Sequence, residues 1–392
     1  MNFDQVKKFL KDGYERNGFD VVAEPPNGEA ELRYPQQETY DVTLRITTED
    51  VEEYSKLMQA RGEFVPISNT GLANRNFRES LVIPLDPGID IRDVDDLFFK
   101  RAGDEKTYVE IDTISLVFAN YFRFEPAYMN LCLDRLFTLP KPIRQASAKQ
   151  ALDVRKIFAH PLSVRVYHIG AHTTDEAIER SDELINGALF TLAHEIGIPL
   201  MLANHYPSSR YEYVQKIKTN NHKMHHITLP DSNFRHDLVR FYQVGLASPI
   251  ATQQFLSFYQ ALELFFQDVS HVGVYDELYH LLRSETFKPD NGNLARIVSL
   301  VEANKREVNN ADLLEQLIRQ HVQSDAIKQV ILDSGTVVEE TVRTLAQRIT
   351  ATRDAIMLAG VHGLPVDDAS VAKDVPLVRF LTEQVILATR AE

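Results

Sequence analysis

The chain has 392 residues, 42 lysines and arginines, 56 aspartates and glutamates, and a formal net charge of −14. This acidic balance argues against a protein coated with nucleic acid over its whole surface, although it is compatible with a local basic groove. A hydrophobic fraction of 44% excludes wholesale disorder, and the length predicts two or three domains. Cys132 is the single cysteine, so no intramolecular disulfide forms and a cytoplasmic location is expected.

The chain begins with the pattern of a short amphipathic helix. Over residues 1–18, Phe3, Val6, Phe9 and Leu10 recur on one side of a helix. The segment lacks the apolar centre of a signal peptide, and no window of the sequence approaches the roughly 20 apolar residues of a membrane span. We therefore expect a protein without a membrane partner.

Residues 1–235 mix strand-like and helix-like segments. β-Branched and aromatic residues with partial alternation favour strands at 39–46, 79–85, 107–124 and 161–169. Short helices are expected at 50–60, 126–137, 144–157 and 175–196. Segments 211–220 and 225–229 fit either class. This region is predicted to be an α+β module, or two modules divided near residue 155.

The last third of the chain has a helical pattern. Of 17 prolines, only Pro289, Pro365 and Pro376 follow Pro249, so long helices are permitted. Apolar residues recur at helical spacing, and helices are predicted at 251–266, 274–284, 294–305, 311–332, 337–358 and 374–389. Residues 241–392 are therefore expected to form an all-α bundle, which makes the whole chain an α+β protein.

Several motifs that would identify an enzyme class are missing from the sequence. It contains no GxGxxG, no GxxxxGK[ST] and no GxSxG, which argues against a dinucleotide-binding protein, a P-loop protein and an α/β-hydrolase. His194-Glu195 begins like a zincin helix, but Ile198 stands where the second histidine ligand belongs. We expect no cofactor.

Histidines gather between residues 160 and 236. Within this stretch His222, His225 and His226 lie close together and are weak candidates for binding a divalent ion. They have no neighbouring carboxylate or thiolate at a diagnostic spacing, so a solvated polar segment is the favoured interpretation. Nearby lysines and tyrosines are also compatible with weak binding of single-stranded nucleic acid.

Two helical segments carry a resemblance to a known family. The first contains the pattern F-L-x-x-Y-x-x-L-E-x-F-F between Phe255 and Phe266, and the second is RITATRDAIMLAGVH at 348–362. In this order they resemble the HEPN-type helical domains, in particular the branch found in bacterial defence proteins of the ApeA kind. The late helix of that family usually has the core R-N-x-x-x-H. The resemblance covers roughly 240–390, whereas residues 1–235 resemble no family.

The resemblance implies a small helical bundle that dimerises and, in active members, is a metal-independent endoribonuclease. In such a site a histidine transfers protons, and an arginine from across the dimer interface holds the phosphate. Arg353 matches the family arginine, and Asp354 stands where asparagine is usual. Leu358 occupies the histidine position, and a hydrocarbon transfers no proton. His362 is the nearest substitute, provided that the helix ends at Gly360 and the chain turns back.

Helical geometry adds a contact that the resemblance does not supply. At 100° per residue, Arg353 lies at the edge of the apolar stripe of its helix, and Glu263 lies at the edge of the stripe that contains Phe255. We therefore predict an ion pair between Glu263 and Arg353. Leu358 falls on the outer face, where it is either a lone exposed leucine or a contact for a partner subunit.

Three functional hypotheses follow. The leading one is a cytoplasmic, catalytically degenerate HEPN-like scaffold or recognition protein in bacterial antiviral defence or a toxin–antitoxin-like system. The alternative is an active endoribonuclease with Arg353, Asp354 and His362 as catalytic residues, or with a histidine from the 160–236 cluster in place of His362. In the third, residues 1–235 bind a phage or host protein and the helices only multimerise the chain. A homodimer is expected, with RNA or a protein as a further partner.

Overall fold

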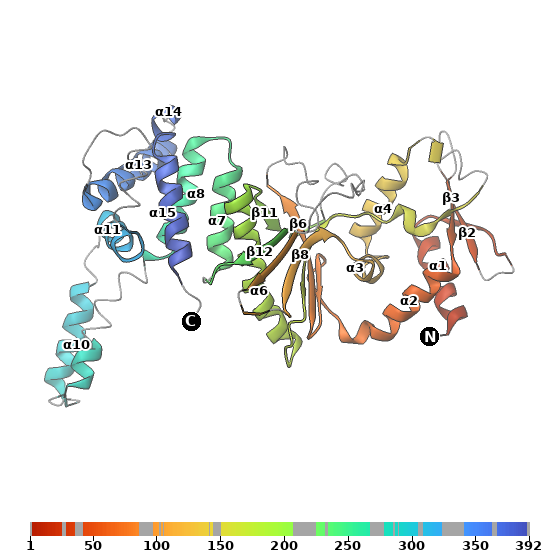
Figure 1. The fold of residues 1–392 in the computed structure, drawn as a ribbon, viewed down its shortest axis with the longest axis horizontal. Helices are drawn as coiled ribbons and strands as arrows, with labels where there is room; N and C mark the ends of the chain where they lie inside the picture. Colours follow the sequence, from red (N-terminus) through yellow and green to blue (C-terminus); the bar gives the residue numbers. More distant parts are fainter. Residues whose placement is uncertain are drawn as a thin grey trace. The chain divides into compact units, whose positions relative to one another are not determined.

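The computed structural model describes residues 2–389 with the exception of 26–28, 36–41, 86–96, 102, 105, 141, 144–149, 207–224, 232–233, 267–277, 285–286, 289, 305–308, 324–340 and 363–366. The side chains of 225–226, 300–304 and 362 also lie outside the description. Sheets occupy the N-terminal part of the chain and helices the C-terminal part, which confirms the predicted α+β class (Figure 1). Of the helices in the described ranges, none combines the length and the apolar character needed to cross a membrane.

The chain divides into two compact units. The first comprises Met1–Ile83, Asp90–Ile185 and Leu202–Thr228, and the second comprises Pro84–Ile89, Asn186–Met201 and Leu229–Glu392. The last boundary is close to the predicted one at 235, but 84–89 and 186–201 belong to the second unit rather than to the N-terminal module. For the latter segment the reason is aromatic packing, since the ring of Phe190 lies 5.5 Å from that of Phe234 and 5.0 Å from that of Tyr242.

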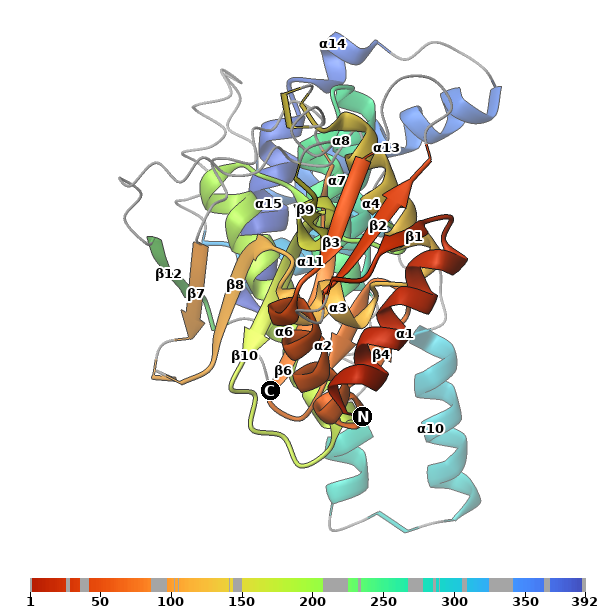
Figure 2. The same ribbon diagram turned by 90° about the vertical axis from the view of Figure 1, so that its right-hand side faces the viewer.

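The first unit contains two sheets. The smaller has the strand order β1 (Asp20–Ala23), β2 (Ala30–Tyr34), β3 (Val42–Ile46) and β9 (Leu152–Asp153), with β9 parallel to β3. The larger has the order β12 (His225–Leu229), β7 (Leu97–Arg101), β8 (Tyr108–Thr113), β10 (Leu162–Tyr167), β6 (Phe77–Pro84), β5 (Gly71–Ala73) and β4 (Val65–Ile67). Strand β11 (Leu200–Leu202) lies at the boundary between the two units along the chain. Figure 2 shows β7, β8 and β10 side by side. In the antiparallel register Val164 of β10 faces Ser80 of β6 and Ile111 of β8.

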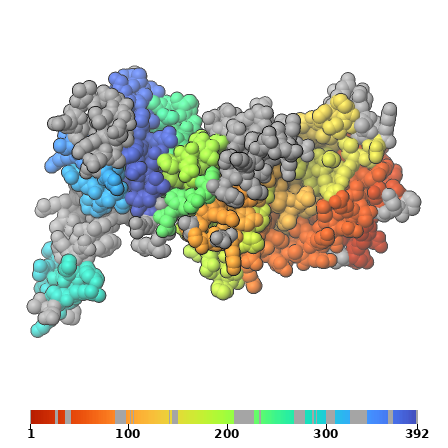
Figure 3. Space-filling model, viewed as in Figure 1, coloured from red at the N-terminus to blue at the C-terminus, as the bar shows by residue number. Residues whose placement is uncertain are grey.

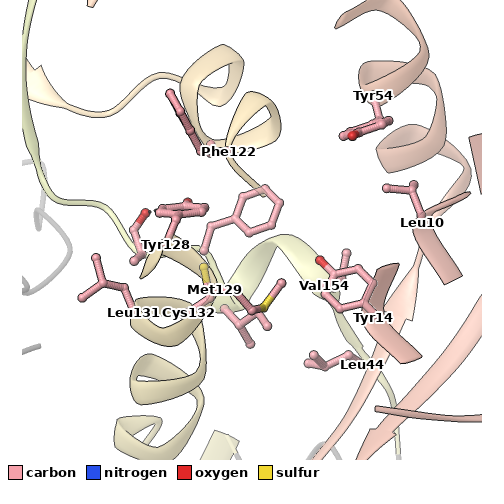
Figure 4. Close-up of a cluster of buried hydrophobic side chains, with 14 of the residues drawn as sticks. Leu10, Tyr14, Leu44, Tyr54, Phe122, Tyr128, Met129, Leu131, Cys132 and Val154 are labelled. Carbon is pink, nitrogen blue, oxygen red and sulfur yellow. Dashed lines mark hydrogen bonds between the residues drawn. The ribbon is translucent and has the colours of Figure 1, made fainter. Parts of the chain in front are cut away.

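Helices of the first unit pack against these sheets. They are α1 (Phe3–Arg16), α2 (Thr48–Ala60), α3 (Leu116–Tyr121), α4 (Pro126–Thr138) and α6 (Thr174–Thr191), which runs on into the second unit, with 3₁₀ turns at Arg61–Glu63 and Val154–Ile157. The predicted amphipathic helix is α1, whose capping box joins Asn2 and Gln5. Its buried face carries Leu10 and Tyr14, which point into the same apolar cluster as Met129 and Cys132 of α4 (Figure 4).

Two sequence-based predictions in this unit are wrong. The expected strand over 107–124 is only the strand β8, because Ser115 accepts the amide of Phe118 at 3.1 Å and starts α3. The expected helix over 144–157 is, in its described part, the short strand β9 and one 3₁₀ turn, since β9 pairs with β3. Segment 211–220 lies outside the described residues, and 225–229 is strand β12.

The second unit is built from helices, as predicted. They are α7 (His236–Ala247), α8 (Ala251–Glu263), α10 (Asn291–Asn304), α11 (Asn310–His321), α13 (Val342–His362), α14 (Asp368–Val371) and α15 (Val375–Ala388), preceded by a π-helical turn at Leu192–Ile196. Among them α8 packs against α7 and α15, and α11 packs against α13. Figure 3 shows α15 in dark blue next to α11 and α8. The predicted helical residues 324–332 and 337–340 lie outside the description.

Candidate functional site

The first helix of the resemblance, α8, is anchored at its start. The backbone amides of Ala251 and Thr252 donate to the carboxylate of Asp368 in α14, at 3.2 and 2.8 Å. These hydrogen bonds lower the pKa of Asp368. Further along α8, the ring of Phe258 is fully buried. The backbone carbonyl of Phe258 accepts a hydrogen bond from the hydroxyl of Thr382 at 3.0 Å. The helix that carries Glu263 is therefore held by α14 and α15.

The second helix of the resemblance, α13, is held by an apolar and a charged contact. Leu345 and Ile349 are fully buried and supply the predicted apolar stripe. On the same helix Arg348 Nη1 lies 2.6 Å from Asp374 Oδ1, which joins α13 to the residue before α15. These contacts fix the rotation of α13 and with it the direction of Arg353.

Arg353 lies between two carboxylates and an aromatic ring. Its Nη2 is 2.7 Å from Glu263 Oε1 of α8, and its Nη1 is 2.9 Å from Asp354 Oδ1. The guanidinium carbon lies 5.6 Å from the centroid of the Tyr259 ring. The hydrogen bond to Asp354 and the charge of Glu263 raise the pKa of Arg353. The predicted ion pair between Glu263 and Arg353 is thus present, and it is about three-quarters buried.

The C-terminal turns of α13 expose apolar side chains. Leu358, at the family histidine position, is 59% exposed, and Met357 and Val361 are 48% and 77% exposed. We call these three residues the α13 apolar strip. Leu358 therefore points away from the helical core of its own unit, as the helical geometry predicts.

His362 is not brought back toward Arg353 by a chain reversal. The expected helix end at Gly360 is wrong, because α13 continues to His362. Nine residues of continuous helix correspond to about 900°, which sets the two positions on opposite sides of α13. Within the described residues, Arg353 makes its polar contacts with Glu263 and Asp354 and none with an imidazole.

The side chains of the three histidines predicted as weak metal ligands lie outside the described part of the structure. His222 lies outside the described residues, and His225 and His226 begin β12 with side chains that are also outside the description. In the part of the chain that the structure covers, no three His, Cys, Asp or Glu side chains are grouped to hold a metal ion.

A charged cluster that the sequence did not predict surrounds Glu383 of α15. Its Oε1 accepts the hydroxyl of Tyr242 at 2.6 Å and Nε of Arg379 at 2.7 Å, and it lies 3.5 Å from Nδ1 of His194. Burial alone would raise the pKa of Glu383, but the neighbouring His194 and the hydrogen bonds from Tyr242 and Arg379 lower it. Glu383 in turn raises the pKa of His194. The four residues come from three separate segments, so no local motif marks the cluster.

Comparison of the chain with protein-family models, curated proteins and solved structures found no match. The fold and the site define it as an α+β protein whose C-terminal helices bring a glutamate and an arginine together between α8 and α13. The resemblance to HEPN-type domains stays an expectation that rests on residues 255–266 and 348–362.

Proposed function

We propose that the second unit is a catalytically degenerate HEPN-like domain that acts as a scaffold or recognition component. The observation that carries the proposal is the surroundings of Arg353, whose guanidinium is engaged by Glu263 and Asp354. A phosphate would have to compete with two carboxylates for this cation. Leu358 supplies no proton at the position where the family has histidine. Arg353 is therefore assigned a structural role between α8 and α13.

The α13 apolar strip supports self-association. Three large apolar side chains on consecutive turns of a helix end are costly to leave in water and favour a partner surface. A homodimer through this strip would serve a scaffold as well as a nuclease. The biological setting, bacterial antiviral defence or a toxin–antitoxin-like system, rests on analogy with the family alone.

Incubation of the purified full-length protein with end-labelled RNA, with and without EDTA, tests the proposal. We expect no cleavage above that of a protein-free control. Efficient cleavage that is lost in Arg353→Ala but kept in Arg343→Ala would overturn it, since Arg343 is an exposed arginine on the same helix.

The alternative function is a metal-independent endoribonuclease that uses Arg353 and His362. Because α13 sets these two positions on opposite sides of one helix, His362 would have to act on the Arg353 site of a second subunit. Cleavage that resists EDTA, disappears in His362→Ala and returns when His362→Ala and Arg353→Ala chains are mixed would support this alternative.

A further inference from the structure

The first unit contains a cavity of about 630 Å³ between α1, α2, the β4–β5 turn, α3 and the start of α4. This volume is in the range of pockets that hold small molecules. The residues that line it come from four separate stretches of the first unit, with Phe9 and Asn69 among them. The cavity is separate from the Arg353 site, so an inference from it goes beyond the proposed function.

Aromatic rings form much of the cavity wall. Phe9 stacks on Tyr54 with ring centroids 5.8 Å apart and an interplanar angle of 24°, and the edge of Phe124 meets Phe9 at 5.9 Å. Tyr54 extends from α2 and is labelled in Figure 4. Tyr121 contributes a further half-buried ring. Flat rings that line a cavity are suited to hold a planar aromatic ligand by stacking.

One cation stands at this wall without a carboxylate partner among the described residues. Arg61 lies with its guanidinium carbon 5.2 Å from the centroid of the Tyr121 ring, and its Nη1 is 3.7 Å from the sulfur of Met58. Burial raises the pKa of Tyr54, and the charges of Arg123 and Arg61 oppose this rise. Arg61 is an exposed residue that lines the cavity, and its planar fork suits an anionic oxygen group.

Groups that accept or donate hydrogen bonds line another side. Glu125 caps α4 by accepting the amide of Tyr128 at Oε2, and in the described contacts its Oε1 accepts no hydrogen bond. Ser68 has a φ of 55°, in the left-handed region that non-glycine residues seldom adopt. Thr70 fixes this conformation, because its amide donates to Ser68 Oγ at 3.3 Å and its hydroxyl donates to the carbonyl of Ala203 at 2.7 Å. The strained turn sets the amide side chain of Asn69 at the cavity.

We propose that this cavity binds a nucleotide. The base would stack on the rings of Tyr121 and Phe9, the phosphate would pair with Arg61, and Asn69 and Glu125 would accept hydrogen bonds from amino groups on the base edge. A purely apolar ligand would make no use of the charge of Arg61 or the amide of Asn69, and an anion without a ring would make no use of the aromatic wall. The shared chemistry is an aromatic base bearing a phosphate, which a free nucleotide or one residue of a single-stranded RNA supplies.

Isothermal titration calorimetry of the full-length protein tests the proposal. The ligands are AMP, GMP, CMP and UMP, the four matching nucleosides, and short single-stranded oligonucleotides of each base. We expect at least one monophosphate to bind about tenfold more tightly than its nucleoside, because the nucleoside lacks the charge-assisted hydrogen bond to Arg61. Arg61→Gln should abolish this difference, and Tyr121→Leu should weaken nucleotide and nucleoside about tenfold alike.

Arg75→Gln is the matched control, since Arg75 is an exposed arginine of the same unit that does not line the cavity. If monophosphates bind, the ligand of the cavity is a free nucleotide. If only oligonucleotides bind and Arg61→Gln weakens their binding, the ligand is a residue of a single strand. No binding by either set, or binding that Arg61→Gln and Arg75→Gln change equally, would overturn the proposal. Should Tyr121→Leu fail to fold, the comparison of Arg61→Gln with Arg75→Gln decides by itself. None of these results depends on ribonuclease activity.

Discussion

Arg353 of α13 and Glu263 of α8 form an ion pair with a distance of 2.7 Å between Nη2 and Oε1. The two side chains are 26% and 30% exposed, so the pair is screened less than a surface pair but is still in contact with water. The pair joins α8 and α13, the two helices that carry the resemblance. The pair therefore helps to hold these two helices together.

A double-mutant cycle with Glu263→Gln and Arg353→Gln should measure this role. We expect a coupling energy of about 0.5–1 kcal/mol, because the pair is partly buried and joins separate helices. Urea unfolding followed by far-ultraviolet circular dichroism supplies the free energies. The control cycle uses Glu315 and Arg319, an i,i+4 pair within α11 at 2.8 Å whose side chains are 19% and 59% exposed, for which about 0.3–0.5 kcal/mol is expected. Zero coupling between Glu263 and Arg353 would contradict their structural role.

The α13 apolar strip makes a prediction about assembly. Leu358→Glu should convert a homodimer into monomers, because a carboxylate in an apolar interface loses its hydration without gaining a partner. Sedimentation velocity ultracentrifugation measures the change, and the monomer should keep its stability within about 0.5 kcal/mol because Leu358 is exposed. Val244→Glu, at a 38% exposed position of α7, is the control that should leave assembly unchanged. A wild-type protein that is monomeric at all concentrations would refute the role of the strip.

A buried ion pair governs the stability of the first unit. Arg123 Nη1 and Nη2 lie 3.0 and 2.8 Å from the carboxylate oxygens of Asp50, and Arg123 Nε donates to the hydroxyl of Tyr14 at 2.8 Å. Neither charged side chain is more than 1% exposed. Arg123→Met should therefore destabilise the first unit by about 3–5 kcal/mol, because Asp50 is left buried without a countercharge.

Urea titration of Arg123→Met against Arg123→Met/Asp50→Leu separates lost pairing from lost packing. The double variant should recover part of the stability, since the uncompensated carboxylate is gone. A double variant that is less stable than Arg123→Met would show that packing around Asp50, rather than its charge, sets the cost.

The cluster around Glu383 predicts a pH dependence of the second unit. The pKa of His194 is raised from 6.5, so its contribution to stability is fully present below pH 6.5 and is lost as the pH rises through the folded-state pKa. The pKa of Glu383 is lowered from 4.5, so its contribution is present above pH 4.5 and is lost as the pH falls through its folded-state pKa. Between pH 4.5 and pH 6.5 both His194 and Glu383 therefore contribute to the stability of the second unit.

The urea midpoint of the wild type should therefore fall between about pH 6 and pH 8 more steeply than that of His194→Gln. His236→Gln, which removes a different histidine of the same unit, is the control variant. Equal slopes for the wild type and His194→Gln would mean that His194 gains no proton affinity on folding.

Local patterns predicted the parts of the fold that local physics controls. The helix α1 lies where apolar periodicity places it, since it buries one regular set of side chains. The strand β10 lies where its β-branched and aromatic residues place it, although both of its faces are buried. The break at Ser115 was missed because apolar residues continue on both sides of it, and one serine hydroxyl decides between strand and helix. The strand β9 was missed because its two residues depend on pairing with β3, which lies far away in the sequence.

Some features of the candidate sites could be predicted from local patterns, and others depend on tertiary packing. The contact of Arg353 with Glu263 was predictable from 100° per residue on two helices, because both residues flank apolar stripes that must face each other. The cluster of His194, Tyr242 and Glu383 and the cavity beside Arg61 were not predictable, since each joins segments whose approach only tertiary packing sets.

Two glycines in the last turns of their helices give a paired test of packing. Gly245 of α7 lies against Phe258, and a Cβ atom there would be 2.6 Å from Cε1 of this fully buried ring. Gly360 of α13 has no atom within 4 Å of the same position. Both substitutions to alanine gain about 1 kcal/mol of helix propensity. They differ only in the space that receives the methyl group.

Gly360→Ala should therefore stabilise the second unit by about 0.5–1 kcal/mol. Gly245→Ala should destabilise it by about 1–2 kcal/mol, because moving Phe258 and separating α7 from α8 costs more than the helix propensity gained. Urea midpoints of the two variants and the wild type, measured together, give both signs. Stabilisation by both substitutions would mean that α7 and α8 move apart at little cost, and that the close approach at Gly245 does not determine their packing.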